Sequence, residues 1–126
     1  MQGYHIYKKG VNQSLLEKDE CFLLVEYMEL KNLKFSHIHH EMFTRSYAQK
    51  NKAKALGVRS GVPDYIICLK DKLLFIEMKR LKGGKTSNDQ AEWIESLNGI
   101  PNVEAVVCCG FDEAKAVIDE NLANKE

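Results

Sequence analysis

The 126-residue sequence contains no apolar run near the ~20 residues that a membrane-spanning helix needs. Its first ten residues, MQGYHIYKKG, include no apolar segment typical of a signal peptide. Internal repeats, low-complexity stretches and linkers are also missing. From these absences we expect one domain spanning residues 1–126, located in the cytoplasm and without a membrane partner.

The chain has four cysteines, and no pair has the C-x-x-C spacing of a zinc or redox site. Cys21, Cys68, Cys108 and Cys109 all lie in apolar runs, which predicts reduced core residues rather than metal ligands or disulfides. The HIHH run at 37–40 has no second ligand cluster to accompany it. We therefore interpret these histidines as polar residues on a half-exposed strand.

The net charge is zero, but the charges are segregated along the chain. Residues 45–85 carry eleven Lys or Arg and three Asp or Glu, whereas residues 86–126 carry two basic and nine acidic residues. Residues 1–44 are close to neutral, with five basic and six acidic residues. Positive charge gathered around a few carboxylates is suited to bringing a polyanion such as DNA to a metal site.

Hydrophobic periodicity and capping residues predict a mixed α/β protein with the element order α-β-α-β-β-α-β-α. Ser14 and Ser87 are candidate N-caps, and Gly57 is expected to end the second helix. The predicted helices span residues 14–31, 46–56, 87–98 and 112–123, and the predicted strands span 34–40, 64–69, 73–79 and 103–108.

The stretch GVPDYIICLKDKLLFIEMK at 61–79 is mostly apolar, yet it contains Asp64, Glu77 and Lys79. Burying a charge costs free energy unless that charge is paired or bound to a metal. If Lys70-Asp71 forms the turn of a hairpin, Asp64 lies directly opposite Glu77 on the neighbouring strand. Lys79 follows two residues later and points to the same face of the sheet.

Opposed carboxylates destabilise a sheet unless a divalent cation lies between them. Mg²⁺ or Mn²⁺ suits this spacing, since either ion accepts one or two carboxylates together with waters and phosphate, and a carbonyl near Met78 adds an oxygen. Such an ion promotes phosphodiester hydrolysis, and Lys79 is placed to hold or deprotonate the attacking water. The structural alternative is an Asp at a strand start and a Glu–Lys pair at a strand end, but the complete pattern favours catalysis.

Pro63-Asp64…Glu77-Met78-Lys79 resembles the signature of the PD-(D/E)XK nuclease superfamily. The strings GVRSGVPD, LFIEMKR and S-x-x-Q-x-x-W resemble the VRR-NUC family within it, over residues 17–107. The resemblance implies a restriction-endonuclease-like core, with a mixed central sheet flanked by helices. It also implies a structure-specific DNA endonuclease that uses Mg²⁺ or Mn²⁺. Asp64 and Glu77 would bind the metal and Lys79 would assist the water.

The same resemblance implies a glutamate on the first helix and a glutamine after the E-x-K strand, which by position are Glu17 and Gln90. Each also fits a capping box, in which the side chain satisfies backbone amides. Glu17 lies in line with an apolar stripe, so we expect it at the metal site directly or through water, with Glu20 as the alternative. Gln90 is expected to orient Lys79 or the scissile phosphate. The family's Pro-Asn pair is replaced by His39-His40, so His37, His39 and His40 are left out of the catalytic set.

The expected partner is branched DNA, bound through phosphates by basic residues on either side of the catalytic strands. Small stand-alone family members of phage or bacterial type resemble junction-resolving dimers, so we expect a homodimer that prefers four-way (Holliday) junctions. Alternatives are a flap or splayed-arm nuclease, a restriction-type nuclease, and a non-catalytic DNA-binding module. The basic residues assigned to DNA are Arg45, Lys50, Lys52, Lys54, Arg59, Lys82 and Lys85.

Overall fold

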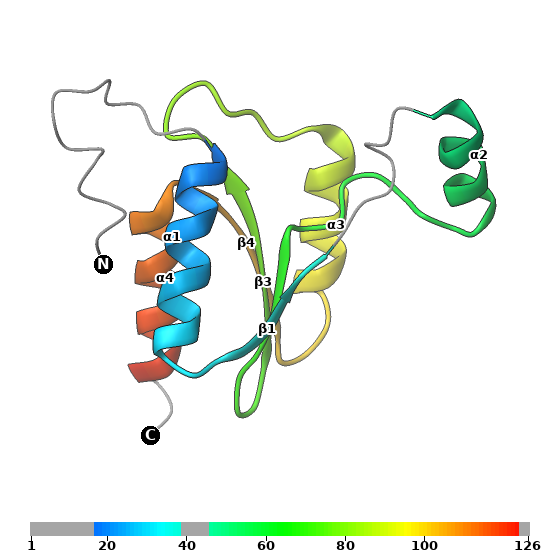
Figure 1. Ribbon diagram of the computed structural model, residues 1–126. Coiled ribbons are helices and arrows are strands. Elements are labelled where there is room, and N and C mark those ends of the chain that lie inside the picture. Colours follow the sequence, from blue (N-terminus) through cyan, green and yellow to red (C-terminus); the bar gives the residue numbers. More distant parts are fainter. Residues whose placement is uncertain (1–16, 39–45, 124–126) are drawn as a thin grey trace, which may run out of the picture. The chain divides into compact units, whose positions relative to one another are not determined.

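The structure is a computed structural model that describes residues 17–38 and 46–123, with side chains described from residue 19 onward. The elements follow the chain in the predicted order (Figure 1). They are α1 (Glu17–Leu30), β1 (Lys34–His37), α2 (Tyr47–Ala55), β2 (Tyr65–Cys68), β3 (Leu73–Lys79), α3 (Asn88–Asn98), β4 (Val103–Cys109) and α4 (Phe111–Ala123).

The described strands form a mixed four-stranded sheet in the order β1-β2-β3-β4. The pairs β1–β2 and β2–β3 are antiparallel. The chain passes from β3 to β4 through α3, the kind of helical crossover that parallel neighbours need. Because β3 is an inner strand, three consecutive residues near its end, Ile76, Glu77 and Met78, are all buried. A charged side chain therefore lies in the most enclosed part of the sheet.

The contacts divide the chain into two compact units. The first comprises Met1–Leu33, Met78–Lys85 and Val107–Glu126. Within it α1 and α4 lie side by side (Figure 1), and the rings of Tyr27 and Phe111 meet edge to face at 5.8 Å. Apolar residues at helical spacing on both helices form its core, which includes Leu24, Met28, Met78, Cys108, Ala114 and Ile118.

The second unit comprises Lys34–Glu77 and Thr86–Val106. Ser87 caps α3 as predicted, since its hydroxyl oxygen accepts from the Gln90 amide at 3.1 Å. The Asn98 side chain holds the other end by exchanging two hydrogen bonds with the backbone of Ala105, at 2.8 and 2.9 Å. The core of this unit includes Ala53, Pro63, Tyr65, Ile67, Leu74, Ile76 and Ala105.

Several predicted boundaries differ from those observed. The first strand is assigned only to Lys34–His37, and the Ser14 cap and residues 39–40 lie outside the described part of the chain. Ser46 caps α2 through the Gln49 amide, and Gly57, with φ of 98°, follows its end.

All four cysteines carry free thiols. Cys68 is exposed because it ends β2 beside the hairpin turn, so its prediction as a core residue is wrong.

No helix in the described part of the chain is long and apolar enough to cross a membrane.

Candidate active site

The predicted hairpin register is confirmed. Tyr65 pairs with Ile76 and Cys68 with Leu73, and the Leu69 amide donates to the Lys72 carbonyl at 2.8 Å across the turn. Continuing this register by one step places Asp64 opposite Glu77 (residues of the same compact unit).

The backbone of Asp64 is also held from the other side. Its carbonyl accepts a 2.7 Å hydrogen bond from the amide of Ile38, which continues the β1–β2 ladder past the His37–Tyr65 pair. Pro63, which cannot donate to a ladder, is buried immediately before it. The start of β2 is therefore fixed in position by two neighbouring strands.

Glu77 is a buried carboxylate, with 4% of the residue exposed. The Gln90 amide nitrogen donates to Glu77 Oε2 at 2.7 Å, which offsets part of the cost of burying this acid. The amide oxygen of Gln90 meanwhile accepts from the Ser87 backbone at 3.0 Å. Gln90 thus uses its amide oxygen to complete the capping box of α3. Its amide nitrogen contacts Glu77, the candidate metal ligand.

Lys79 ends β3 two residues after Glu77, so alternation along the strand puts both side chains on the same face. Its carbonyl accepts from the Gly110 amide at 3.0 Å. The glycine loop returns beside it, because a Cβ added at Gly84 would lie 2.9 Å from the Lys79 Cβ. Lys82 and Lys85, both exposed, are carried on this same loop.

Glu17 is the first residue of α1, and its side chain lies outside the described atoms. Glu20, the alternative acid, is 3% exposed and its Oε1 accepts from the Phe111 amide at 2.5 Å. Phe111 is the first residue of α4, where backbone amides lack partners inside the helix and favour a negative charge. The recorded contact of Glu20 is therefore that of a helix cap within the first compact unit.

The described residues contain no group of three or more His, Cys, Asp and Glu arranged to hold a metal ion. The hairpin instead offers two carboxylates that an extension of its register by one step brings opposite each other, those of Asp64 and Glu77, together with the backbone carbonyl of Met78. Mg²⁺ and Mn²⁺ fit such a set, since these hard ions keep several waters and need only one or two carboxylates.

The basic residues assigned to DNA are mostly exposed. Lys52, Lys54, Arg59, Lys82 and Lys85 are solvent-accessible, Lys50 is half-buried, and Arg45 lies outside the described residues. The α2 lysines also have a structural role, because Lys52 and Lys54 lie in its last turn and complement the helix dipole.

His37 is exposed on the outer strand β1, with its ring 5.2 Å from that of Tyr65. His39 and His40 lie outside the described residues.

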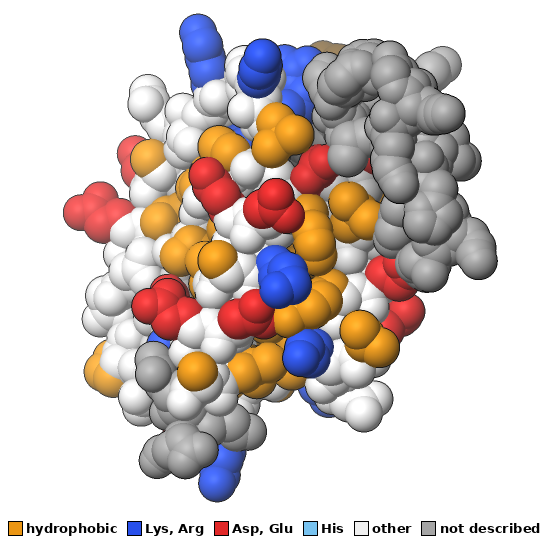
Figure 2. Space-filling model, turned by 90° about the vertical axis from the view of Figure 1, so that its left-hand side faces the viewer, with side chains coloured by type: hydrophobic (Ala, Val, Ile, Leu, Met, Phe, Trp, Pro, Cys, Tyr) orange, Lys and Arg blue, Asp and Glu red, His pale blue; other side chains and the backbone are white. Residues whose placement is uncertain are grey.

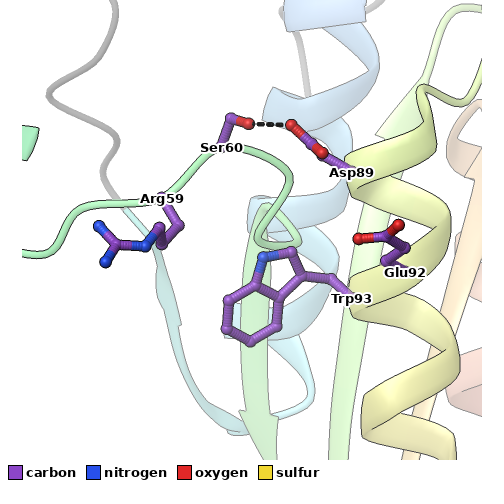
Figure 3. Close-up of a pocket in the computed structure, with 5 residues that line it drawn as sticks. All are labelled: Arg59, Ser60, Asp89, Glu92 and Trp93. Carbon is purple, nitrogen blue, oxygen red and sulfur yellow. Dashed lines mark hydrogen bonds between the residues drawn. The ribbon is translucent and has the colours of Figure 1, made fainter.

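The structure also has a surface pocket that was not predicted as part of the site. Its volume is about 210 Å³, and it is lined by Arg59, Ser60, Asp89, Glu92 and Trp93 (Figure 3). The only signal in the sequence was the S-x-x-Q-x-x-W string, which puts the tryptophan one helical turn beyond Gln90. The closeness of Ser60 and Asp89 has no local signal, because 29 residues separate them.

The sheet order, the helical crossover and the acid-bearing hairpin together define a nuclease-type α/β fold. The sequence profile of the VRR-NUC domain matches residues 6–112, and the chain therefore belongs to the VRR-NUC domain family. This confirms the family predicted from the sequence motifs.

A solved structure titled "VRR_NUC domain protein" has the same fold, with a TM-score of 0.73 and 24% sequence identity. The match covers 89% of this chain and 92% of that chain. The likeness supports the PD-(D/E)XK-like core, so the predicted fold class is confirmed. No curated protein matches the sequence.

Proposed function

We propose that this chain is a Mg²⁺- or Mn²⁺-dependent endodeoxyribonuclease that cuts branched DNA, with four-way junctions as its preferred substrate. The observation that carries the proposal is the buried Glu77, which is held by Gln90 and follows Ile76, the partner of Tyr65, so that one further step of the register brings it opposite Asp64. A structural acid has little reason to occupy an inner strand opposite a second acid, whereas a metal ligand does.

The residues that would hold the ion are Asp64, Glu77 and the carbonyl of Met78, with Glu17 as a further ligand directly or through water. When bound, the ion polarises the scissile phosphate and acidifies a water molecule. Gln90 keeps Glu77 in one orientation, since its own amide is fixed by the cap of α3. Site residues held in this way need little reorganisation when substrate binds.

Lys79 is proposed to hold or deprotonate the attacking water and to stabilise the negative charge that develops on the phosphate. Its place on the strand supports this role, because it shares a face with Glu77 and lies beside the glycine loop. Lys82 and Lys85 on that loop, together with Arg45, Lys50, Lys52, Lys54 and Arg59, are proposed to contact backbone phosphates.

Two active sites are needed to resolve a four-way junction, and a C₂ homodimer supplies both with matching symmetry. The exposed apolar side chains of α1 support self-association, since Phe22 is 60% exposed and Leu30 is 74% exposed. On the side where α1 and α4 lie, hydrophobic side chains are gathered among charged ones (Figure 2). A surface of this kind is typical of an interface with a polar rim.

The test is a cleavage panel of four-way junctions, flaps, splayed arms and linear duplexes, each incubated with Mg²⁺, Mn²⁺ or EDTA. We expect metal-dependent cuts near the branch, fastest in the four-way junction, and no cuts in EDTA. Cleavage confined to flaps or splayed arms would favour the alternative nuclease. Binding to branched DNA without cleavage under any condition would identify a non-catalytic DNA-binding module.

A further inference from the structure

The pocket in Figure 3 has two walls that come from different parts of the second compact unit. One wall is the loop at residues 59–61, which leads directly into Asp64. The other is the first two turns of α3, which carry Asp89, Glu92 and Trp93. Gln90, the partner of Glu77, lies on the same turns of this helix. Both walls are therefore connected by short stretches of the chain to residues of the proposed catalytic site.

The two walls are fixed against each other. Gly61 has φ of 95°, and a Cβ at this position would lie 2.7 Å from the backbone carbon of Asp89, so only glycine permits the close approach. The Ser60 hydroxyl donates to Asp89 Oδ2, which joins the loop to the helix (Figure 3). A pocket with a preformed shape loses less conformational entropy when a ligand binds.

The lining combines three kinds of chemistry. Trp93 presents a half-buried indole, Asp89 and Glu92 present carboxylates that accept hydrogen bonds, and the exposed Arg59 carries a cation (Figure 3). Two carboxylates would repel a phosphate held inside the pocket. They would instead attract the amino edge of a nucleobase, whose face stacks well on an aromatic ring. At about 210 Å³, the pocket is smaller than sites for drug-sized ligands and suits one flat ring system.

We propose that this pocket binds one unpaired nucleobase of the DNA substrate, stacked on Trp93 with its amino edge toward Asp89 and Glu92. Arg59 contacts the phosphate of the same nucleotide. Adenine and cytosine are favoured over thymine, because each carries an exocyclic amino group and thymine carries a carbonyl oxygen in its place. The inference rests on the proposed function and adds to it a reason for choosing branched DNA, in which bases near the branch can leave the stack.

Trp93 is the only tryptophan of the chain, so intrinsic tryptophan fluorescence reports on this pocket alone. The full chain in EDTA is titrated with three short single strands of equal length. One alternates adenine and cytosine, one contains only thymine, and one is abasic throughout, with the same number of phosphates. We expect saturable quenching by the adenine–cytosine strand, weaker quenching by thymine, and none by the abasic strand.

Equal quenching by the abasic strand would overturn the inference, because the signal would then follow phosphates rather than bases. Unchanged fluorescence would also overturn it where anisotropy of a labelled strand shows that DNA is bound. If either of these results is found and the chain still cleaves branched DNA with Mg²⁺ or Mn²⁺, the proposed function stands and only the base pocket fails. If no strand binds in any arm, the base pocket fails, and the cleavage panel of branched DNA with Mg²⁺ or Mn²⁺ decides the proposed function separately.

Three variants separate stacking from charge. Trp93→Ala is expected to weaken binding of the adenine–cytosine strand about tenfold and to leave the abasic strand unchanged. Trp93→Phe, which keeps an aromatic face, should lose less. Glu92→Gln should reduce the preference for adenine and cytosine over thymine. The matched control is Glu95→Gln, which removes the same charge from an exposed position outside the pocket and should alter nothing.

Thermal unfolding followed by circular dichroism establishes that each variant is folded. If Trp93→Ala fails to fold, the Phe and Gln variants and the quenching of the unaltered chain decide the question. An equal loss of affinity for all three strands in Trp93→Ala would show that the tryptophan supports the fold and not a base.

Discussion

At the scale of single residues, the hairpin combines burial in the sheet with an acidic side chain, two features that normally exclude each other. The end of β3 is buried as an inner strand requires, yet it carries the acid Glu77. The conflict is reduced by Gln90, whose amide has one end on the α3 cap and the other on the carboxylate. A Gln90 amide bonded at both ends has less freedom to turn away, which favours a steady hydrogen bond to Glu77.

Asp64 tests the metal site without reference to catalysis. An ion that binds only the folded chain, at about a hundred times its dissociation constant, adds about 2.7 kcal/mol to the free energy of unfolding. We expect Mn²⁺ to raise the melting temperature by several degrees. The Asp64→Asn variant should lose both this rise and all cleavage.

Asp71→Asn is the matched control, since Asp71 is an exposed acid in the turn of the same hairpin. It should keep the full thermal response to Mn²⁺ and normal cleavage. Normal cleavage by Asp64→Asn, or full activity in EDTA, would falsify the metal assignment.

Lys79 is expected to differ from its basic neighbours in what it contributes. Loss of a general base or charge stabiliser lowers the chemical rate about 10²- to 10⁴-fold. Lys79→Ala should therefore remove turnover while leaving the affinity for junction DNA close to normal. Single-turnover rates at saturating protein, measured beside binding isotherms, separate these quantities.

Lys82→Ala, in the adjoining exposed loop, should show the opposite pattern, with weaker binding, a shallower salt dependence and an unchanged single-turnover rate. If Lys79→Ala behaved like Lys82→Ala, Lys79 would be one of the phosphate contacts.

At the scale of elements, α1 and α4 are joined by a polar cluster as well as by their apolar faces. The Tyr27 hydroxyl donates to Asp119 Oδ1, and Lys115 Nζ lies 2.9 Å from Asp119 Oδ2. Lys115 also lies 5.2 Å from the centre of the Tyr27 ring. These hydrogen bonds lower the pKa of Asp119, while burial and the bond to Asp119 raise the pKa of Tyr27.

These pKa shifts set the lower and upper limits of the pH range in which the cluster stabilises the fold. A lowered carboxyl pKa stabilises the fold above about pH 4, and this contribution is lost as the pH falls through the folded value. The pKa of Tyr27 is raised, and the hydrogen bond to Asp119 also raises the pKa of Lys115. Both shifts stabilise the fold, and this stability is lost as the pH rises through the folded values, above about 10. The cluster therefore contributes fully between these limits.

Tyr27→Phe removes the donated hydrogen bond and keeps the ring. We expect a loss of about 1 kcal/mol in the free energy of unfolding near neutral pH, because one hydrogen bond has about that net value. The difference from the unaltered chain should shrink toward pH 3 and toward pH 11 in urea titrations. Tyr47→Phe, at an exposed position, should show no difference at any pH. A constant deficit for Tyr27→Phe across the range would contradict the pH window.

The sequence predicted those features that local rules determine. The hairpin register follows from a two-residue turn and strand alternation, and the α3 cap follows from Ser87 and Gln90 three residues apart. Features that join distant segments had no such signal. The cap that Glu20 provides for α4 spans 91 residues, and the Ser60–Asp89 bond depends on a loop shape that only the folded backbone defines.

The same limit of sequence-based prediction applied to the charged residues of the candidate site. Asp64, Glu77 and Lys79 could be placed from alternation along two adjacent strands. The hydrogen bond between Gln90 and Glu77 could not, because it depends on how α3 lies against the sheet within the second unit. Cys68 shows the converse error, since an apolar sequence context does not reveal that a strand ends at the surface.

At the scale of the whole molecule, the segregation of charge bears on how the proposed DNA substrate would be approached. Eleven of the eighteen basic residues lie in the segment from 45 to 85, which includes the candidate hairpin, and nine of the eighteen acidic residues follow it. An association guided by such a distribution depends steeply on salt, since phosphate contacts release counterions. Part of the proposed shape selectivity would then come from how many phosphate tracts the protein contacts at once.

Assembly would determine that number. A homodimer contacts two arms of a junction at once and offers two active sites, whereas a monomer contacts one arm and cuts one strand at a time. Light scattering at micromolar concentration should therefore give twice the 14.4 kDa mass of the chain. Cleavage of a junction extruded from a cruciform plasmid should give linear product from paired cuts, because both sites act within the lifetime of one complex.

The exposed apolar side chains of α1 supply the variants for this test. Phe22→Asp places a charge in the proposed interface and should halve the measured mass, since a buried unpaired charge costs several kcal/mol. Leu56→Asp, at an exposed position after α2, is the control and should leave the mass unchanged. The Phe22 variant should then release nicked circles instead of linear plasmid. A monomeric mass for the unaltered chain, with unpaired single nicks in the cruciform, would exclude the dimer and favour a nuclease of flaps or splayed arms.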